Sequence, residues 1–125
     1  DPKKLRAELL SVYGIGPETA DDIVLYVANL PTFVMDSYTV RMVERIGITP
    51  SRKRYEDYQA LFENHLPSDA QLFNEYHALL DEHSKLVCRK REPRCGECVL
   101  RDICREGKRA LRPHSSSPKR NRNVK

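Results

Sequence analysis

Four cysteines lie close together in a short basic stretch, CRKREPRCGECVLRDIC, and they are the only cysteines of the chain. They are Cys88, Cys95, Cys98 and Cys104, with the spacing C-x6-C-x2-C-x5-C. Four thiolates on tight loops are typical of a metal site, because zinc takes four in a tetrahedron and an iron–sulfur cluster also takes four. Disulfides are disfavoured, since an intracellular chain keeps its thiols reduced. The segment is therefore predicted to bind metal, and the spacing by itself does not separate zinc from iron–sulfur.

A second candidate site is the glycine turn in VYGIGPETADDIV, residues 12–24. A helix that ends near Val12, a Gly-x-Gly turn and a helix that starts at Pro17 make a helix-hairpin-helix. Gly14 and Gly16 can take positive φ and let another backbone approach. The free N–H groups at the start of the second helix form an anion site that suits a DNA phosphate. The alternative is an ordinary glycine C-cap followed by a loop.

Acidic residues stand where two helices are expected to begin. Glu18, Asp21 and Asp22 suit the positive end of a helix dipole. Asp36 directly precedes SYTVRMVERIG and occupies a natural N-cap position. Capping alone explains an aspartate there, yet a cap residue also holds a carboxylate fixed at an exposed helix end.

The remaining side chains that could do chemistry are given structural roles. Tyr38 is expected to pack between helices. The histidines are expected at the surface or in the core; they are His65, His77, His83 and His114.

The elements that position these residues are predicted to be helical nearly throughout. Apolar residues recur with helical period along residues 5–12, 20–27, 36–47, 54–66 and 69–87. Ala20, Ile23, Val24 and Val27 are expected to form the buried stripe of the second segment. Phe33–Met35 is too short for a paired strand and is expected to be a buried connector. The class is all-α, and the stretch from Ser115 onward is expected to be disordered.

Charge is distributed unevenly along the 125 residues. Residues 1–84 carry 8 Lys or Arg against 14 Asp or Glu, while residues 105–125 carry 8 against 1. A polyanion such as nucleic acid would therefore meet the C-terminal third or local backbone sites. A merely solvating tail is the alternative. No apolar run is long enough to span a membrane and no signal-peptide pattern is present, so a cytoplasmic protein is expected.

The cysteine segment together with VYGIGPETA and VMDSYTVRMVERIG resembles the C-terminal part of the endonuclease III family of DNA glycosylases, the helix-hairpin-helix family with a Gly/Pro motif and an Asp. This resemblance implies a partial helical barrel and a [4Fe–4S] cluster on the four cysteines, with Zn²⁺ as the second choice. It further implies that Asp36 is catalytic and that the hairpin binds DNA through Gly14, Ile15, Gly16 and Thr19.

The chain departs from this family pattern at Glu18. In the bifunctional members the corresponding position is a lysine that attacks the sugar as a Schiff-base nucleophile, and a carboxylate cannot form an imine. No lysine lies between Lys4 and Lys53. The expected chemistry is therefore base release without strand cleavage.

A second departure is that the helices which precede the hairpin in the family are missing. Either the chain is a fragment or a second polypeptide supplies the other half. Within the chain, three parts are expected: a helical glycosylase region at 1–84, a cysteine loop at 85–108, and a basic disordered tail at 109–125.

The resemblance implies a monofunctional DNA N-glycosylase that acts on double-stranded DNA with a damaged base. GIGPETAD and MDSYTVR look most like the 3-methyladenine branch, which acts on alkylated purines. A mismatch thymine or uracil glycosylase, or one for oxidised pyrimidines, is the alternative within the family. The competing classes are a non-catalytic DNA-binding module and an interaction domain whose fold is stabilised by bound zinc.

Overall fold

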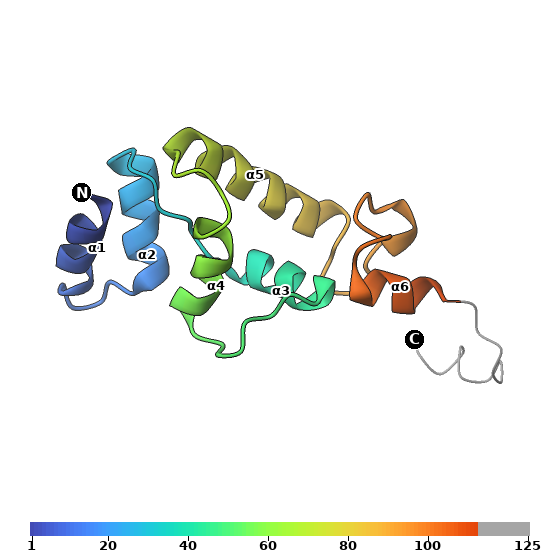
Figure 1. The fold of residues 1–125 in the computed structure, drawn as a ribbon. Helices are drawn as coiled ribbons and strands as arrows, with labels where there is room; N and C mark the ends of the chain where they lie inside the picture. The colour runs from blue at the N-terminus through green and yellow to red at the C-terminus, as the bar shows by residue number, and fades with distance from the viewer. Residues whose placement is uncertain (113–125) are drawn as a thin grey trace.

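A computed structural model describes residues 1–112, and within that range the chain forms helices and no strands, as the all-α prediction requires. The helices, shown in Figure 1, are α1 (Pro2–Leu10), α2 (Pro17–Asp22), the π-helix η1 (Ile23–Val27), α3 (Ser37–Ile46), α4 (Tyr55–Glu63), α5 (Ala70–Leu86), the 3₁₀ turn η2 (Cys95–Glu97) and α6 (Arg105–Leu111). Helix α6 extends past the expected boundary at residue 108. The rest of the expected tail, from residue 113, lies outside the described residues.

Aspartates cap the N-termini of three helices. The side chains of Asp1, Asp36 and Asp69 each accept a hydrogen bond from a backbone N–H in the first turn of α1, α3 and α5. At the other end of α3, Gly47 has φ 102°, a left-handed conformation that ends the helix. The predicted limits of α3 are therefore confirmed by local capping.

The core is built around the connector between η1 and α3. Phe33, Val34 and Met35 are at most 2% exposed and form no strand. The Phe33 ring stacks on Phe62 of α4 with centroids 4.3 Å apart, and Phe73 of α5 packs edge-on against it at 5.4 Å. The connector was predicted correctly, and it ties the hairpin end of the molecule to α4 and α5.

The helix after the hairpin changes its winding midway. The N–H of Ala28 bonds to the carbonyl of Ile23, five residues back, so η1 is wider than an α-helix. This rotates the side chains: Leu25 is 1% exposed, whereas Val27 is 78% exposed. The predicted buried stripe is thus correct at Ala20 and Val24 and wrong at Val27, because an α-period was assumed throughout.

A buried ion pair fixes the hairpin to the core. Asp21 is fully buried and accepts hydrogen bonds from Arg6 of α1 at 2.7 Å, from Gln59 of α4 at 2.8 Å and from Thr32 of the connector at 3.1 Å. The expectation that Asp21 simply faces the positive helix end is therefore wrong. Its carboxylate joins three elements that are distant in the sequence.

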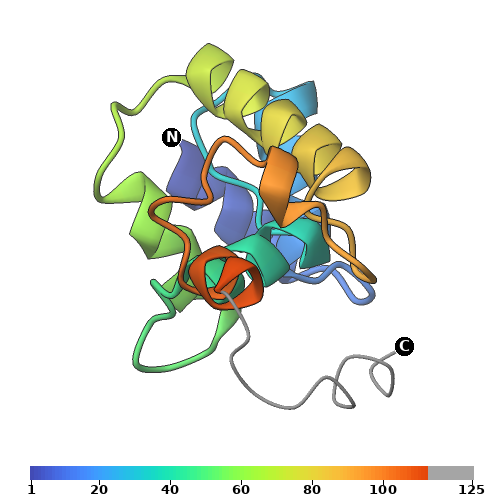
Figure 2. The same ribbon diagram turned by 90° about the vertical axis from the view of Figure 1, so that its right-hand side faces the viewer.

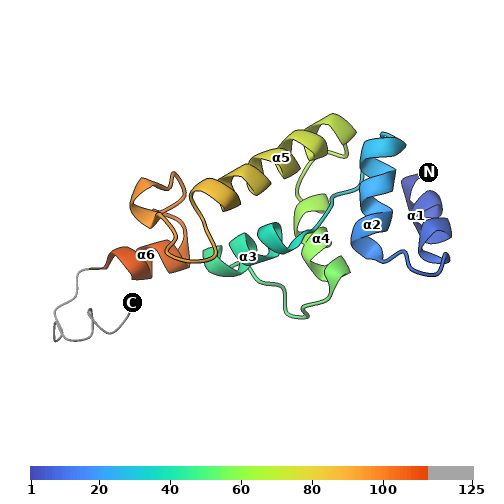
Figure 3. The same cartoon turned by 180° about the vertical axis from the view of Figure 1, so that it is seen from behind.

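The helices lie in order along an elongated molecule. Helices α1 and α2 lie side by side at one end, α3, α4 and α5 occupy the middle, and the cysteine loop and α6 form the other end (Figures 1 and 3). Figure 2 looks onto that second end, where the cysteine loop and α6 stand in front of the remaining helices. In the part described, no helix has the length and apolar character needed to cross a membrane.

Candidate active site and cysteine centre

The glycine turn has the conformation of an open hairpin. Gly14 has φ 92°, which favours glycine, whereas Gly16 is the N-cap of α2 with φ −92°. Only Gly14 therefore uses the positive φ that was expected of both. A Cβ built on either glycine meets nothing within 4 Å. Ile15 is partly exposed and Thr19 is exposed, so this surface is accessible to a partner.

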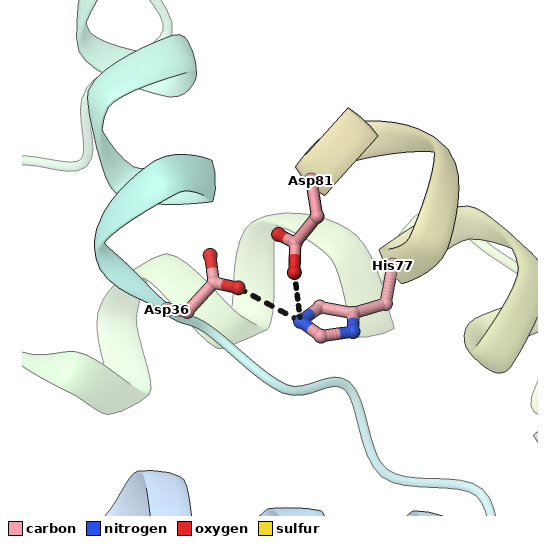
Figure 4. Close-up of side chains that lie close together, drawn as sticks. All are labelled: Asp36, His77 and Asp81. Atoms are coloured by element: carbon pink, nitrogen blue, oxygen red, sulfur yellow. Dashed lines mark hydrogen bonds and ion pairs between the residues drawn. The ribbon is translucent and has the colours of Figure 1, made fainter. Parts of the chain in front are cut away.

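Asp36 is held at the start of α3 by two different donors. Its Oδ1 accepts the N–H of Thr39 at 2.9 Å, which is the capping bond. Its Oδ2 lies 2.9 Å from Nε2 of His77 on α5 (Figure 4). The predicted N-cap is confirmed, and the carboxylate is fixed from both the backbone and a distant helix.

His77 belongs to the site and not to an ordinary surface or core position. Its other ring nitrogen, Nδ1, is hydrogen bonded to the hydroxyl of Tyr26 at 2.6 Å. Asp81, one turn further along α5, places Oδ2 at 3.6 Å from Nε2 of His77. In residues 1–112, Asp36, His77 and Asp81 are the only set of three or more Asp, Glu, His or Cys whose ligand atoms all lie within 4.8 Å of one another.

The charges of this cluster shift the pKa values of its members. Burial by itself raises the pKa of Asp36, but hydrogen bonding, above all with His77, outweighs it and holds that pKa below its ordinary value. The hydrogen bond to Asp36 raises the pKa of His77. Partial burial, and then the neighbouring Asp36, raise the pKa of Asp81 to about 6.

Two acids of α2 face the same cluster. Partial burial raises the pKa of Glu18, and the charge of Asp36 raises it further. Burial also raises the pKa of Asp22, where His77 acts in the opposite direction. Glu18 is therefore close enough to Asp36 for the charges of the two groups to influence each other.

The four cysteines line one small cavity between α3, the cysteine loop and α6. The cavity has a volume of about 30 Å³, and Arg45 of α3 and Gly107 of α6 also border it. Backbone N–H groups point at two of the sulfurs: Leu100 donates to Cys98 and Gly107 to Cys104, both at 3.3 Å. All four sulfurs therefore border one cavity, which is the arrangement that a shared metal site requires.

Two side chains from outside the cysteine loop also contact the cysteine sulfurs, and one of them also contacts the backbone of the loop. Arg45 donates to Sγ of Cys88 at 3.3 Å and to the carbonyl of Arg89 at 2.7 Å. His83 of α5 places Nε2 at 3.3 Å from Sγ of Cys98. His83 was expected at the surface or in the core, and it lies instead at the cysteine centre.

Of the other residues considered, two have the roles expected of them. His65 is exposed, and its ring nitrogen Nδ1 lies 2.9 Å from the carbonyl oxygen of Leu61. The Tyr38 ring lies under Arg41 and Lys85, at 5.4 and 5.5 Å from its centroid, so it packs α3 against α5.

Comparison with known proteins places this geometry in context. No family model matches the chain. The "Putative DNA repair glycosylase MJ1434" of Methanocaldococcus jannaschii is 45% identical over 100 residues, which are 80% of this chain and 45% of that protein. Endonuclease III of Sulfolobus acidocaldarius is 34% identical over 105 residues, 84% of this chain and 46% of that protein.

Solved structures agree with the sequence relatives. A trapped covalent endonuclease III–DNA intermediate superposes with a TM-score of 0.76 at 24% identity, over 86% of this chain and 49% of that one. The chain has the endonuclease III fold. A non-covalent endonuclease III–DNA complex matches with the same TM-score. The chain spans about half the length of the curated relatives and endonuclease III structures it matches.

At the Asp36 site, the residues that the sequence did not indicate are Tyr26, His77 and Asp81. His77 and Asp81 are four residues apart, a spacing that places side chains on one helix face, so their pairing had a sequence signal. No sequence signal indicated that these two residues approach Asp36, because 41 residues separate Asp36 from His77.

Proposed function

We propose that the chain belongs to the endonuclease III family and forms part of a monofunctional DNA glycosylase. The observation that carries this proposal is the Asp36 carboxylate, which is held at the start of α3 with 12% of its side chain exposed. In the glycine turn, Glu18 occupies the position at which the bifunctional members of the family have a lysine. The relatives named as endonuclease III and as a DNA repair glycosylase support the family assignment. The neighbouring structures that contain DNA support duplex DNA as the partner.

Asp36 has the properties that a glycosidic reaction requires. Its pKa is held low, so it carries a negative charge at neutral pH, and the sugar develops positive charge as its bond to the base breaks. Thr39 and His77 hold the carboxylate in one orientation, and a preorganised negative charge is what stabilises such a developing positive charge. Asp36 is thus the catalytic residue of the proposed reaction, and capping and catalysis use the same geometry.

Glu18 supports hydrolysis and not lyase chemistry. The trapped endonuclease III intermediate is a covalent complex between that protein and DNA. Such a bond needs a nucleophilic group on the protein, and a Schiff base needs an amine. Here the side chain beside Asp36 is a carboxylate with a raised pKa. The proposed product is therefore a free base and an intact abasic strand.

The charge of the site favours an alkylated base. Around His77 stand four carboxyl groups, those of Glu18, Asp22, Asp36 and Asp81. A purine alkylated on a ring nitrogen carries a positive charge, which such a site attracts. A neutral mismatched thymine or uracil gains nothing from these charges, so mismatch glycosylase activity is the second candidate.

The proposed cofactor is a [4Fe–4S] cluster on Cys88, Cys95, Cys98 and Cys104. Bonds of about 2.3 Å to zinc place tetrahedral sulfurs about 3.8 Å apart. No three of the four sulfurs approach one another within 4.8 Å, a spacing that favours a larger group. The N–H groups of Leu100, Gly107 and Arg45 would stabilise thiolate sulfurs. When bound, the cluster would fix the fold of this loop.

The remaining features of the chain fit a protein that works on DNA. The hairpin residues Gly14, Ile15, Gly16 and Thr19 are proposed to bind the DNA backbone, and the basic C-terminal third is proposed to add nonspecific affinity. A cytoplasmic, nucleoid-associated location follows from such a role. The competing proposal is a non-catalytic DNA-binding module, in which Asp36 is only a helix cap.

The decisive experiment compares two capping aspartates in the full-length protein. Duplexes carrying a methylated purine, a G·T or G·U mismatch, or an oxidised pyrimidine are assayed for free base, for breakage before and after hot alkali, and for adducts trapped by borohydride. We expect base release from the methylated duplex, breakage only after alkali, and no adduct.

Asp36→Asn should still bind DNA, and it should release the base about a hundredfold or more slowly. Asp69→Asn is the matched control, because Asp69 caps α5 in the same way and asparagine is an equally good cap. Equal activity in both variants would reduce Asp36 to a cap and favour the binding module. An efficient adduct with the unmodified protein would refute the monofunctional assignment.

A further inference from the structure

Two carboxylates converge on one nitrogen of His77. Oδ2 of Asp36 lies 2.9 Å from Nε2 and Oδ2 of Asp81 lies 3.6 Å from it, as Figure 4 shows. The two carboxylates come from different elements, the start of α3 and the middle of α5. One ligand oxygen of each lies within 4.8 Å of the other. A single water can hydrogen bond to two oxygens at that separation, because each bond spans about 2.8 Å.

The two carboxylates are not equivalent. Both oxygens of Asp36 already accept hydrogen bonds, from Thr39 and from His77. In Asp81, by contrast, Oδ1 is shielded from solvent and has no hydrogen-bond partner within the described residues. An unpaired carboxylate oxygen beside a second carboxylate is costly, and a proton on Asp81 relieves that cost. The geometry therefore makes Asp81 the better of the two at receiving a proton.

We propose that Asp81 is a second catalytic residue, the base that accepts the proton of the attacking water, while Asp36 stays ionised and faces the sugar. This inference rests on the proposed glycosylase function. The bond between C1′ and the base nitrogen breaks, and its electron pair leaves with the alkylated base, which becomes neutral. The positive charge passes to the sugar. The water oxygen then bonds to C1′, and its proton passes to the Asp81 carboxylate and later to solvent.

The acid–base properties of the two groups support this division of roles. The pKa of Asp36 lies below its ordinary value, so Asp36 is a weak base. The pKa of Asp81 is raised to about 6, near the pH at which an intracellular enzyme works. A general base is most effective when its pKa lies close to the working pH. Two acids whose environments push their pKa values apart are typical of paired catalytic carboxylates.

His77 acts as a positioning residue for both carboxylates. Its ring is held by the hydroxyl of Tyr26 on Nδ1, so Nε2 points at the two carboxyl groups. The π-helical turn that contains Tyr26 thereby contributes to the site. The charged and titratable groups that face Asp81 or its partners come from α2, η1, the start of α3 and α5: they are Glu18, Asp22, Tyr26, Asp36, His77 and Lys85.

The test is the pH dependence of base release by the full-length protein in single turnover on a methylated duplex. With the unmodified protein, the rate should rise as the pH passes through about 6 and then level off, because Asp81 must be ionised to accept a proton. Asp81→Asn should bind the duplex normally, react about a hundredfold more slowly at pH 7.5 and lose this rise. Asp81→Glu should keep the rise, and added formate should restore part of the rate of Asp81→Ala.

Glu82→Gln is the matched control, because Glu82 is the exposed acid next to Asp81 on the same helix. It should leave both rate and pH profile unchanged. If Asp81→Asn matches the unmodified protein, the assignment of Asp81 is wrong and the proposed function stands. If Asp81→Asn is slow but keeps the rise with pH, and formate does not help Asp81→Ala, the role of Asp81 is structural and the assignment is again wrong. If the unmodified protein releases no base from any duplex, the proposed function itself has failed.

Discussion

Replacing Asp21 by asparagine should strongly destabilise the fold. The Asp21 side chain is fully buried, and its two oxygens accept hydrogen bonds from Arg6, Gln59 and Thr32 at 2.7, 2.8 and 3.1 Å. Asparagine has nearly the same shape, but its NH₂ group faces donors and Arg6 loses its buried counter-charge. Breaking a buried pair from one side costs about 3–5 kcal/mol. Since a domain is stable by only about 5–15 kcal/mol, much of the free energy of unfolding should be lost.

Urea unfolding followed by circular dichroism measures this loss. Arg6→Met should also destabilise, because it leaves the Asp21 carboxylate buried without its cation. The double variant should lose less free energy of unfolding than the two single variants lose together, since it removes both charges of the pair. Asp102→Asn is the control: that side chain is 93% exposed and lies 3.9 Å from Arg101, so no measurable change is expected. A loss below about 1 kcal/mol for Asp21→Asn, or strict additivity, would refute the reasoning.

Further outcomes concern the metal centre, the hairpin and the histidine. When the protein is purified without oxygen, iron and sulfide analysis should find about four irons and about four sulfides per chain. Cys95→Ala should lose the iron and the sulfide, and residues 85–104 should unfold and become sensitive to proteolysis. Gly16→Val meets no neighbouring atom, so it should cost at most about 1 kcal/mol through the poorer N-cap that valine makes. It should bind all duplexes more weakly in a filter assay. Gly14→Val should destabilise the fold further, because φ at Gly14 is 92°. The fold raises the pKa of His77 above its ordinary 6.5. The stability that His77 contributes is therefore present below pH 6.5 and is lost as the pH rises through the folded pKa. In urea unfolding measured from pH 5.5 to 8.5, His77→Asn should flatten this decline in the free energy of unfolding.

The sequence by itself determined what depends on near neighbours. The start of α3 followed from Asp36 and its end from Gly47, because capping bonds join residues within four positions. The spacing of the four cysteines predicted one shared metal site, and in the structure all four border one cavity. The buried connector at Phe33–Met35 followed from its composition. These features were predictable because the interactions that cause them are local.

Only the tertiary structure decided what Asp36 meets. Its hydrogen bond to His77 spans 41 residues, and that of His77 to Tyr26 spans 51. Both depend on how α5 lies against α3 and η1, and packing angles are set by many weak contacts that no single residue pattern records. The π-helix at Ile23–Val27 was equally hidden, because no local residue pattern signals it. It buries Leu25 and leaves the Tyr26 hydroxyl within hydrogen-bonding distance of His77. The sequence thus placed the carboxylate at a helix end, and the fold supplied its partners.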